Sequence, residues 1–356
     1  MAELEDEFFI DYAKLDDIQR SFVDRQVNRH MVVTGTAGSG KSLIALHKAR
    51  EVSKLGNYAI VVFTKSLRRY FENGLKKLGL TNVYHYHDWK KEKPLVRYLI
   101  VDECQDFSSQ EIEELKNSAE ICFFFGDTDQ TIMSFKCECL SVDDSARLLG
   151  LRRAEPLYTN YRLTIENAKL AEVLGKVDDV EEKCVRHGEK PKLIKKNSIE
   201  SQIDEIIRLK NNNSLSSIGV LMPYNTKRTA SNRCGNEKFS VEFVKDYIES
   251  KGYPVEYKYR DLDSSIMDLD FHSSNIKVLT WWCAKGLQFK DVFLLNCNAD
   301  YEEEKRKALY VAATRASERL YLLYSGTLSS MFPEPESEIY AGSELDLSHL
   351  FNKKTK

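Results

Sequence analysis

Short apolar runs alternate with stretches of helical pattern along the first part of the chain. The runs are rich in β-branched and aromatic residues and predict strands of four to seven residues. Strands of this length that alternate with helices are typical of a parallel sheet covered on both faces. Strands are expected at the start of 30–52 and at 58–64, 98–103 and 121–127, with helices at the end of 30–52 and at 66–79 and 109–118.

The same alternation restarts after about residue 150 and predicts a second α/β unit. Polar stretches at 210–217 and 261–275 predict loops. The 356 residues are 42% hydrophobic, which supplies enough apolar material for two cores. Strands are expected at 217–223, 276–281, 292–296 and 320–325, and helices at 164–175, 240–252 and 305–316. The expected organisation is an N-terminal domain at 1–150, a C-terminal domain at 151–340 and a tail at 341–356.

Charge and cysteine usage exclude several classes of protein. The formal net charge of −3 gives no global basic field, so a nucleic-acid site must be a local patch. The eight cysteines include no CxxC pair, which argues against zinc and favours a reducing, cytoplasmic setting. The acidic N-terminus lacks a signal-peptide core, and no apolar run approaches the ~20 residues of a membrane span. No membrane partner is therefore expected.

A glycine-rich octapeptide between an expected strand and an expected helix matches the P-loop pattern G-x-x-x-x-G-K-[ST]. The glycines let backbone N–H groups close round phosphates, the lysine reaches the β and γ phosphates, and the hydroxyl ligates Mg²⁺. We therefore expect ATP and Mg²⁺ as cofactors, Lys41 as a catalytic residue and Ser42 as a metal ligand. The cofactor-binding octapeptide is Gly35, Thr36, Ala37, Gly38, Ser39, Gly40, Lys41 and Ser42.

Three carboxylates lie within five positions at the end of the expected strand 98–103. In a P-loop protein, the acid that ends a neighbouring strand completes the Mg²⁺ site, a role that suits Asp102. Glu103 is then placed to polarise the attacking water as general base. Asp106 either caps the following helix or pairs with a basic residue.

The sequence DECQD at 102–106 resembles the DExQD box of superfamily-one helicases of the UvrD/Rep type. Further boxes resemble other motifs of that family, in the family's order. The resemblance implies an α/β fold of two RecA-like P-loop lobes, with parallel sheets covered by helices and ATP in the cleft between the lobes. These boxes are LDDIQ (15–19), VVFTKS (61–66), GDTDQTI (126–132), LYTNYR (157–162), TWWCAKGLQF (280–289) and LYVAATRA (309–316).

The resemblance also implies roles for single residues around the nucleotide. It makes Gln19 the reader of the adenine edge and Tyr161 the side chain that stacks on the base. Gln130 becomes the γ-phosphate sensor. Arg162 would reach the same phosphate and Arg315 would be the arginine finger, so that two arginines stabilise the charge on the transferring phosphoryl group.

Nucleic-acid contacts are expected just after the second strand. The resemblance implies that Phe63 and Thr64 touch single-stranded DNA. Lys65 begins a basic stretch that either tracks phosphates or is only a solvated helix face. The other basic residues of this stretch are Arg68, Arg69, Lys76 and Lys77.

The sequence departs from the family's pattern at several positions. Met133 and Phe135 stand where the family usually carries Tyr and Trp on which bases stack. Trp282 replaces a histidine, and for Trp282 and Phe135 base stacking and core packing both stay open. Gln288 replaces a glutamate and still has the atoms to hydrogen-bond a ribose hydroxyl.

The expected function is an ATP hydrolase and helicase or translocase on single-stranded nucleic acid, with DNA favoured over RNA. The resemblance implies 3′→5′ movement. Lys65 and Leu99 are 34 positions apart, so the chain has little room there for the accessory subdomain of larger relatives. The alternative is an ATP-driven regulatory switch that gates a protein partner, such as a nuclease in a defence or repair complex, without unwinding.

Overall fold

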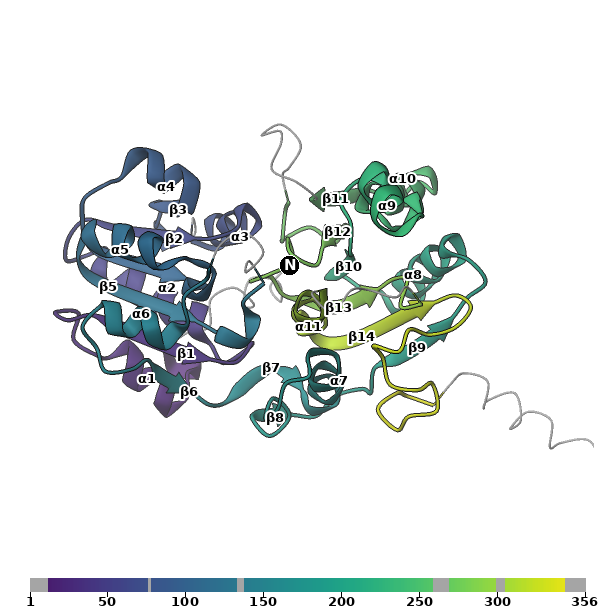
Figure 1. Ribbon diagram of the computed structural model, residues 1–356, viewed down its shortest axis with the longest axis horizontal. Coiled ribbons are helices and arrows are strands. Elements are labelled where there is room, and N and C mark those ends of the chain that lie inside the picture. Colours follow the sequence, from purple (N-terminus) through teal and green to yellow (C-terminus); the bar gives the residue numbers. More distant parts are fainter. Residues whose placement is uncertain (1–11, 76–77, 133–137, 259–268, 299–304, 343–356) are drawn as a thin grey trace, which may run out of the picture. The chain divides into compact units, whose positions relative to one another are not determined.

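The structure is a computed structural model that describes residues 12–75, 78–132, 138–258, 269–298 and 305–342. The chain divides into two compact units (Figure 1). The expected boundary after residue 150 falls before the last strand of the first unit's sheet. Unit 1 comprises Met1–Arg162, Leu269–His272 and Lys285–Leu287, and unit 2 comprises Leu163–Asp268, Ser273–Ala284 and Gln288–Lys356.

Unit 1 is built on a six-stranded sheet in the order β3-β2-β4-β5-β1-β6, with neighbouring strands parallel. Successive residues of a strand point to opposite faces, and here both faces are apolar. Val33 packs into one hydrophobic cluster and Val32 into the other. The parallel sheet buried on both faces, predicted from the apolar runs, is confirmed. The strands are β1 (Met31–Gly35), β2 (Tyr58–Val62), β3 (Val83–His85), β4 (Val96–Asp102), β5 (Ala119–Gly126) and β6 (Glu155–Leu157).

Helices cover each face of this sheet (Figure 1). Phe22, Ile44 and Phe71 bring α1 (Asp17–Val23), α2 (Lys41–Val52) and α3 (Lys65–Leu75) onto one cluster. The other cluster is covered by α4 (Tyr86–Glu92), α5 (Ser109–Asn117) and α6 (Val142–Leu148). The short elements β3, α4, α6 and β6 have no counterpart among the expected ones, because three to seven residues give too little periodicity to stand out.

Unit 2 repeats the architecture with a six-stranded parallel sheet in the order β11-β12-β10-β13-β14-β9. Val220 of the sheet, Ile203 of α8 and Val244 of α10 belong to one core cluster. The α/β fold class with helix-covered parallel sheets is thus confirmed for both units. The strands are β9 (Lys192–Lys195), β10 (Ile218–Met222), β11 (Val255–Lys258), β12 (Ile276–Thr280), β13 (Phe289–Leu294) and β14 (Ala316–Tyr324).

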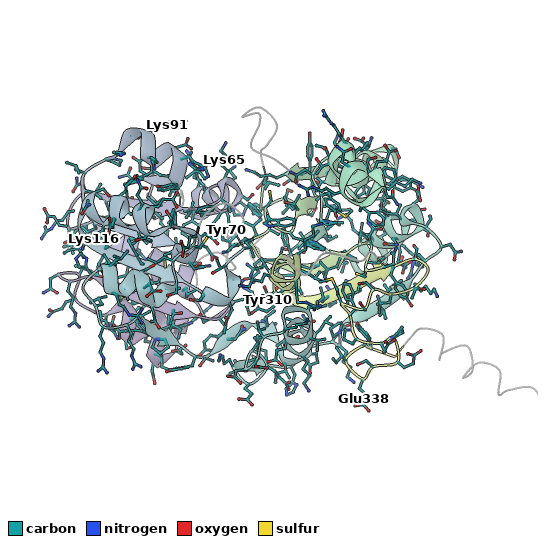
Figure 2. The ribbon with its side chains drawn as sticks, viewed as in Figure 1. Lys65, Tyr70, Lys91, Lys116, Tyr310 and Glu338 are labelled. Atoms are coloured by element: carbon teal, nitrogen blue, oxygen red, sulfur yellow. The ribbon has the colours of Figure 1, made fainter. Side chains whose placement is uncertain are left out.

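Five α-helices and a small sheet complete the described part of unit 2, although the first strand of that sheet begins at Asn160, within unit 1. Tyr310, labelled in Figure 2, lies on α11, which packs against α7 at Gly175, where a Cβ would come within 2.8 Å of the Tyr310 ring. Strands β7 (Asn160–Thr164) and β8 (Cys184–Arg186) form a two-stranded sheet. The helices are α7 (Ile165–Gly175), α8 (Ile199–Asn213), α9 (Lys227–Cys234), α10 (Val241–Ser250) and α11 (Arg306–Ala313).

Two predicted boundaries are wrong. The expected loop 210–217 begins inside α8, because Ile203, Ile206 and Leu209 recur at helical spacing and hold the helix on the core as far as Asn213. The expected helix 305–316 ends at Ala313, and β14 takes up residue 316. Residues 261–268 of the other expected loop and 343–356 of the expected tail lie outside the described residues. Among the helices of the described part, none has the length and apolar character to cross a membrane.

Candidate active site

The P-loop forms the turn between β1 and α2, as the sequence predicts. Gly38 and Gly40 adopt left-handed backbone conformations with φ of +86° and +93°, which glycine alone adopts at little cost. The Lys41 ammonium donates to the carbonyls of Gly35 at 2.7 Å and Thr36 at 3.0 Å. The lysine therefore lies against the loop that is expected to hold the phosphates, at the N-terminus of a helix of 12 residues.

Asp102 is the last residue of β4, and its carboxylate contacts the side chain of Ser42. The Ser42 hydroxyl donates to Asp102 Oδ2 at 2.6 Å. Burial and the neighbouring Glu103 raise the pKa of Asp102 to about 6, against the hydrogen bond from Ser42 and the charge of Lys41. A hydroxyl and a carboxylate side by side next to a phosphate loop form an oxygen donor set that fits Mg²⁺, which usually takes one or two carboxylates together with substrate phosphates.

Glu103 occupies a strained position immediately after the strand. Its φ is +60°, an unusual conformation for a residue other than glycine, of the kind that clusters at functional sites. The Gln105 amide donates to Glu103 Oε2 at 2.6 Å and orients the carboxylate. Residues 104–106 continue as a short 3₁₀ helix. The expected general base thus lies one position from the expected metal ligand, with its carboxylate held by a neighbouring amide.

The box that follows β5 is tied to the box that follows β4. The amide oxygen of Gln105 accepts from the backbone N–H of Asp127 at 2.9 Å. The Gln130 amide donates to Asp127 Oδ2 at 2.5 Å, and Gln130 is buried. Because parallel strands end at the same edge of the sheet, the two boxes are neighbours in space, and Gln130 joins the carboxylate cluster through Asp127.

A lysine that the sequence analysis did not single out enters this cluster. Lys285 belongs to unit 1 and is 1% exposed. Its ammonium lies 2.5 Å from Asp106 Oδ2, 2.6 Å from the carbonyl of Gln130 and 3.5 Å from Glu103 Oε2. Of the two expectations for Asp106, the pairing with a basic residue is confirmed. The other expectation, that Asp106 caps the following helix, is wrong, because Ser108 is the N-cap of α5 and forms a capping box.

The expected base-binding residues lie at the rim of the P-loop. Gln19 is buried, and its amide donates to the Ser39 carbonyl at 3.3 Å. The Tyr161 backbone N–H donates to the Gly38 carbonyl at 3.0 Å, while its side chain is 37% exposed. Burial and a hydrogen bond with Asp16 raise the pKa of the Tyr161 hydroxyl. One glutamine and one accessible ring therefore border the same loop.

Arg162 is placed with the acidic groups of unit 1. A Cβ added to Gly38 would lie 2.5 Å from Arg162 Cβ, so the arginine packs on the P-loop. Burial lowers the pKa of Arg162, while Tyr70, Glu103 and Asp102 act in the opposite direction. Tyr70 projects from α3 (Figure 2). The structure therefore brings an arginine within electrostatic reach of the expected base and metal ligand.

Arg315 and Gln288 lie in unit 2. The Arg315 guanidinium is buried and donates to the Val311 carbonyl at 2.8 Å and to Thr314 Oγ1 at 2.9 Å. Gln288 is partly exposed and immediately precedes β13. Their expected contacts with the nucleotide stay predictions.

Of the expected nucleic-acid contacts that the structure describes, Phe63, Thr64 and Lys65 belong to unit 1 and Trp282 to unit 2. Phe63 packs edge-on against Phe107 with ring centroids 5.1 Å apart, and Thr64 accepts from the Leu67 N–H at 3.1 Å as α3 begins. Trp282 is half-buried and stacks on Trp281 at 6.2 Å. Lys65 is the first residue of α3 and is labelled in Figure 2. Phe135, Met133, Lys76 and Lys77 lie outside the described residues.

Solved structures of helicases are similar to the chain. The C-terminal domain of a possible DNA helicase from Lactobacillus plantarum WCFS1 is 18% identical over 51% of this chain and 97% of its own, with a TM-score of 0.36. Arterivirus nonstructural protein 10, a helicase in complex with DNA, is 15% identical over 87% of this chain, with a TM-score of 0.43. The PRRSV helicase is 14% identical over 89% of this chain, with a TM-score of 0.47. The chain spans 62% and 57% of the length of those two viral proteins. Among curated proteins none matches.

Two family models match the chain over the regions that carry the boxes. The UvrD-like helicase C-terminal domain matches residues 276–323, which contain the two boxes of unit 2 at 280–289 and 309–316. The viral superfamily 1 RNA helicase core domain matches residues 31–210, half of the chain, including the P-loop and DECQD. The resemblance drawn from the boxes is thereby confirmed, and the chain belongs to the superfamily 1 helicases.

Proposed function

We propose that this protein is an ATP-dependent translocase or helicase on single-stranded nucleic acid, and that it hydrolyses ATP at the P-loop of unit 1. The observation that supports this most directly is a set of groups suited to ATP hydrolysis that gathers around the P-loop of unit 1. The set is Lys41, Ser42, Asp102, Glu103, Gln130 and Arg162.

Each member of the set has a distinct task in the proposed reaction. Lys41 and the P-loop N–H groups hold the phosphates. Ser42 and Asp102 would hold Mg²⁺, which supplies charge neutralisation on the transferring phosphoryl group. Glu103 accepts a proton from the attacking water. Gln130 reports on the γ-phosphate, and Arg162 stabilises the charge that develops on it.

The proposed substrate strand is DNA, with movement in the 3′→5′ direction. The support is the resemblance of the boxes to the UvrD/Rep type, in which the box that VVFTKS resembles touches single-stranded DNA. Thr64 and Lys65 begin a helix whose N-terminus suits a phosphate, and Trp282 offers a face for a base. The match to a viral RNA helicase core keeps RNA as the alternative strand.

Steady-state ATP hydrolysis tests the proposal. The wild-type chain should hydrolyse ATP with Mg²⁺, and a single-stranded oligodeoxythymidine should raise the rate. Glu103→Gln should bind ATP but turn over about 10²–10⁴-fold more slowly, because the general base is lost. Glu92→Gln, an exposed carboxylate on α4, is the matched control and should keep the wild-type rate.

Two outcomes would redirect the interpretation. Hydrolysis that neither DNA nor RNA stimulates would support the regulatory switch that gates a protein partner. Wild-type turnover in Glu103→Gln would remove the assigned base. Strand displacement on a 3′-tailed duplex then separates a helicase from a translocase, and an oligoribonucleotide in the same assays decides between DNA and RNA.

A further inference from the structure

Three separate backbone segments of unit 1 meet at the ammonium of Lys285. Asp106, at 2.5 Å, comes from the box after β4, and the Gln130 carbonyl, at 2.6 Å, comes from the box after β5. Lys285 itself comes from Lys285–Leu287, a three-residue segment of unit 1 that lies between two unit 2 segments in sequence. The Lys285 and Asp106 side chains are 1% and 0% exposed.

This ion pair is poorly explained by stability alone. Taking two charges out of water is costly, and well-packed apolar residues often replace a buried ion pair without loss of stability. Burial lowers the pKa of Lys285, but the charges of Asp106 and Glu103 outweigh burial, and its pKa is raised overall. The lysine is therefore held as a cation. Unlike an apolar side chain, a cation has donors for the Gln130 carbonyl and attracts the Glu103 carboxylate, whose Oε2 lies 3.5 Å away.

The segment that carries Lys285 is fitted closely to α3. Gly286 has a φ of +77°, and a Cβ on it would lie 2.7 Å from Leu67 Cδ1. Leu287 is buried. The tight turn at Gly286, which has no space for a side chain, fixes the backbone position of the neighbouring Lys285. The Lys285 ammonium therefore reaches the two boxes from a defined position.

We propose that Lys285 is a positioning residue for hydrolysis: its ammonium holds the Glu103 carboxylate and the Gln130 backbone in the arrangement that turnover requires. This inference rests on the proposed function and adds a residue from outside the P-loop and the two acidic boxes. The ammonium contacts Asp106, the Gln130 backbone carbonyl and Glu103, whereas phosphate and Mg²⁺ are expected to be held by other groups, Lys41, Ser42 and Asp102. Its loss should therefore lower kcat and leave ATP binding in place.

Two variants separate positioning from folding. Lys285→Met leaves the Asp106 carboxylate buried beside an apolar side chain, so this variant should melt at a lower temperature. Lys285→Met combined with Asp106→Asn removes both charges and should recover most of the melting temperature. If Lys285 positions the site, kcat stays about 10²-fold low in both variants, because small displacements of reacting groups cost that much, while the KM for ATP stays within about twofold.

Lys277→Met is the matched control. Lys277 is a buried lysine of unit 2 whose ammonium donates to the Ser273 carbonyl at 2.6 Å and lies 3.6 Å from Glu256. Its replacement should lower the melting temperature and leave kcat at the wild-type value.

The experiment measures melting temperature, kcat and the KM for ATP for wild type and the three variants. A double variant that regains kcat together with its melting temperature would overturn the positioning role. A rise in KM with unchanged kcat would also overturn it, since Lys285 would then act on binding. If the wild type itself hydrolyses no ATP, the proposed function fails, and the role of Lys285 fails with it. If the wild type and the double variant are both fully active, only the positioning role of Lys285 is refuted.

Discussion

Replacing Gly40 by alanine should disturb base recognition as well as the P-loop backbone. Gly40 is the N-cap of α2, with φ 93° and ψ 12°. A Cβ at this position would lie 2.4 Å from Gln19 Nε2 and 3.3 Å from Gln19 Cδ. Since the first distance is far inside van der Waals contact, the Gln19 side chain has to move away from the loop.

The magnitude follows from two separate costs. A residue other than glycine in the left-handed region costs roughly 1–2 kcal/mol. Moving Gln19 breaks its amide's bond to the Ser39 carbonyl and the bond that its Oε1 accepts from the Asp16 N–H, both 3.3 Å long. Each is worth about 0.5–1.5 kcal/mol. The free energy of unfolding should therefore fall by about 2–5 kcal/mol.

Gly150→Ala is the matched control for backbone strain. Gly150 has a φ of +79° in the same unit, and a Cβ there would meet nothing within 4 Å. Its replacement should cost only the roughly 1–2 kcal/mol of strain. In urea unfolding, the difference between the two variants isolates the contact with Gln19. In a Gln19→Ala background the obstacle is gone, and Gly40→Ala should cost no more than Gly150→Ala.

The same variants test the role assigned to Gln19. If Gln19 reads the adenine edge, Gly40→Ala should lower the preference for ATP over GTP in kcat/KM, whereas Gly150→Ala should keep it. Two results would refute the reasoning: equal losses of stability in Gly40→Ala and Gly150→Ala, or a cost of Gly40→Ala that persists undiminished in the Gln19→Ala background. An unchanged base preference would remove Gln19 from adenine recognition.

Two further predictions concern one arginine and one glutamate. Arg162→Ala should lower ATP turnover by at least about 10³-fold, because it removes the cation from the expected γ-phosphate position; unchanged turnover would contradict this assignment. Glu205→Gln should lower the free energy of unfolding at pH 7 by about 1–2 kcal/mol, since Glu205 binds Lys196 and the half-exposed Arg208. Burial raises the pKa of Glu205, but Arg208 and Lys196 outweigh it, so its pKa lies below the ordinary 4.5. The contribution is therefore complete above pH 4.5 and is lost as the pH falls through the folded-state value. Urea unfolding from pH 7 down to pH 3 should show wild type and variant converging below pH 4.5, and a constant difference would be inconsistent with this linkage.

The parts of the site that lie in continuous motifs were predictable from sequence. Strand, loop and helix follow one another in a P-loop, so the positions of Lys41 and Ser42 depend only on local backbone geometry. Parallel strands end at one edge of the sheet, which places Asp102 beside Ser42 and the Gln130 box beside the Glu103 box. These groups come together because each directly follows a strand of the same sheet.

The remaining parts depend on contacts between distant residues or on weak local patterns. Lys285 and Asp106 are 179 positions apart, and no periodicity in the chain links them. The expectation that Asp106 pairs with a basic residue is confirmed, but the chain has 52 lysines and arginines, and nothing in the sequence indicates which of them is the partner. The end of α8 was misread because its last turn is polar, while the apolar positions that hold it lie earlier in the helix.

The three carboxylates of DECQD differ in the kind of group that each one contacts. The Ser42 hydroxyl donates to Asp102 and the Gln105 amide donates to Glu103, both at 2.6 Å, whereas Asp106 has the Lys285 ammonium at 2.5 Å. Neutral donors orient a carboxylate without cancelling its charge, but an ammonium in contact cancels most of it. The same ammonium also lies 3.5 Å from Glu103, but its shorter contact makes Asp106 the carboxylate that it neutralises most strongly, so Asp102 and Glu103 stay assigned to the metal ion and to the proton from water. Asp106 instead serves as the fixed counter-ion that keeps the lysine in place, so one short acidic box divides into two reactive carboxylates and one that anchors them.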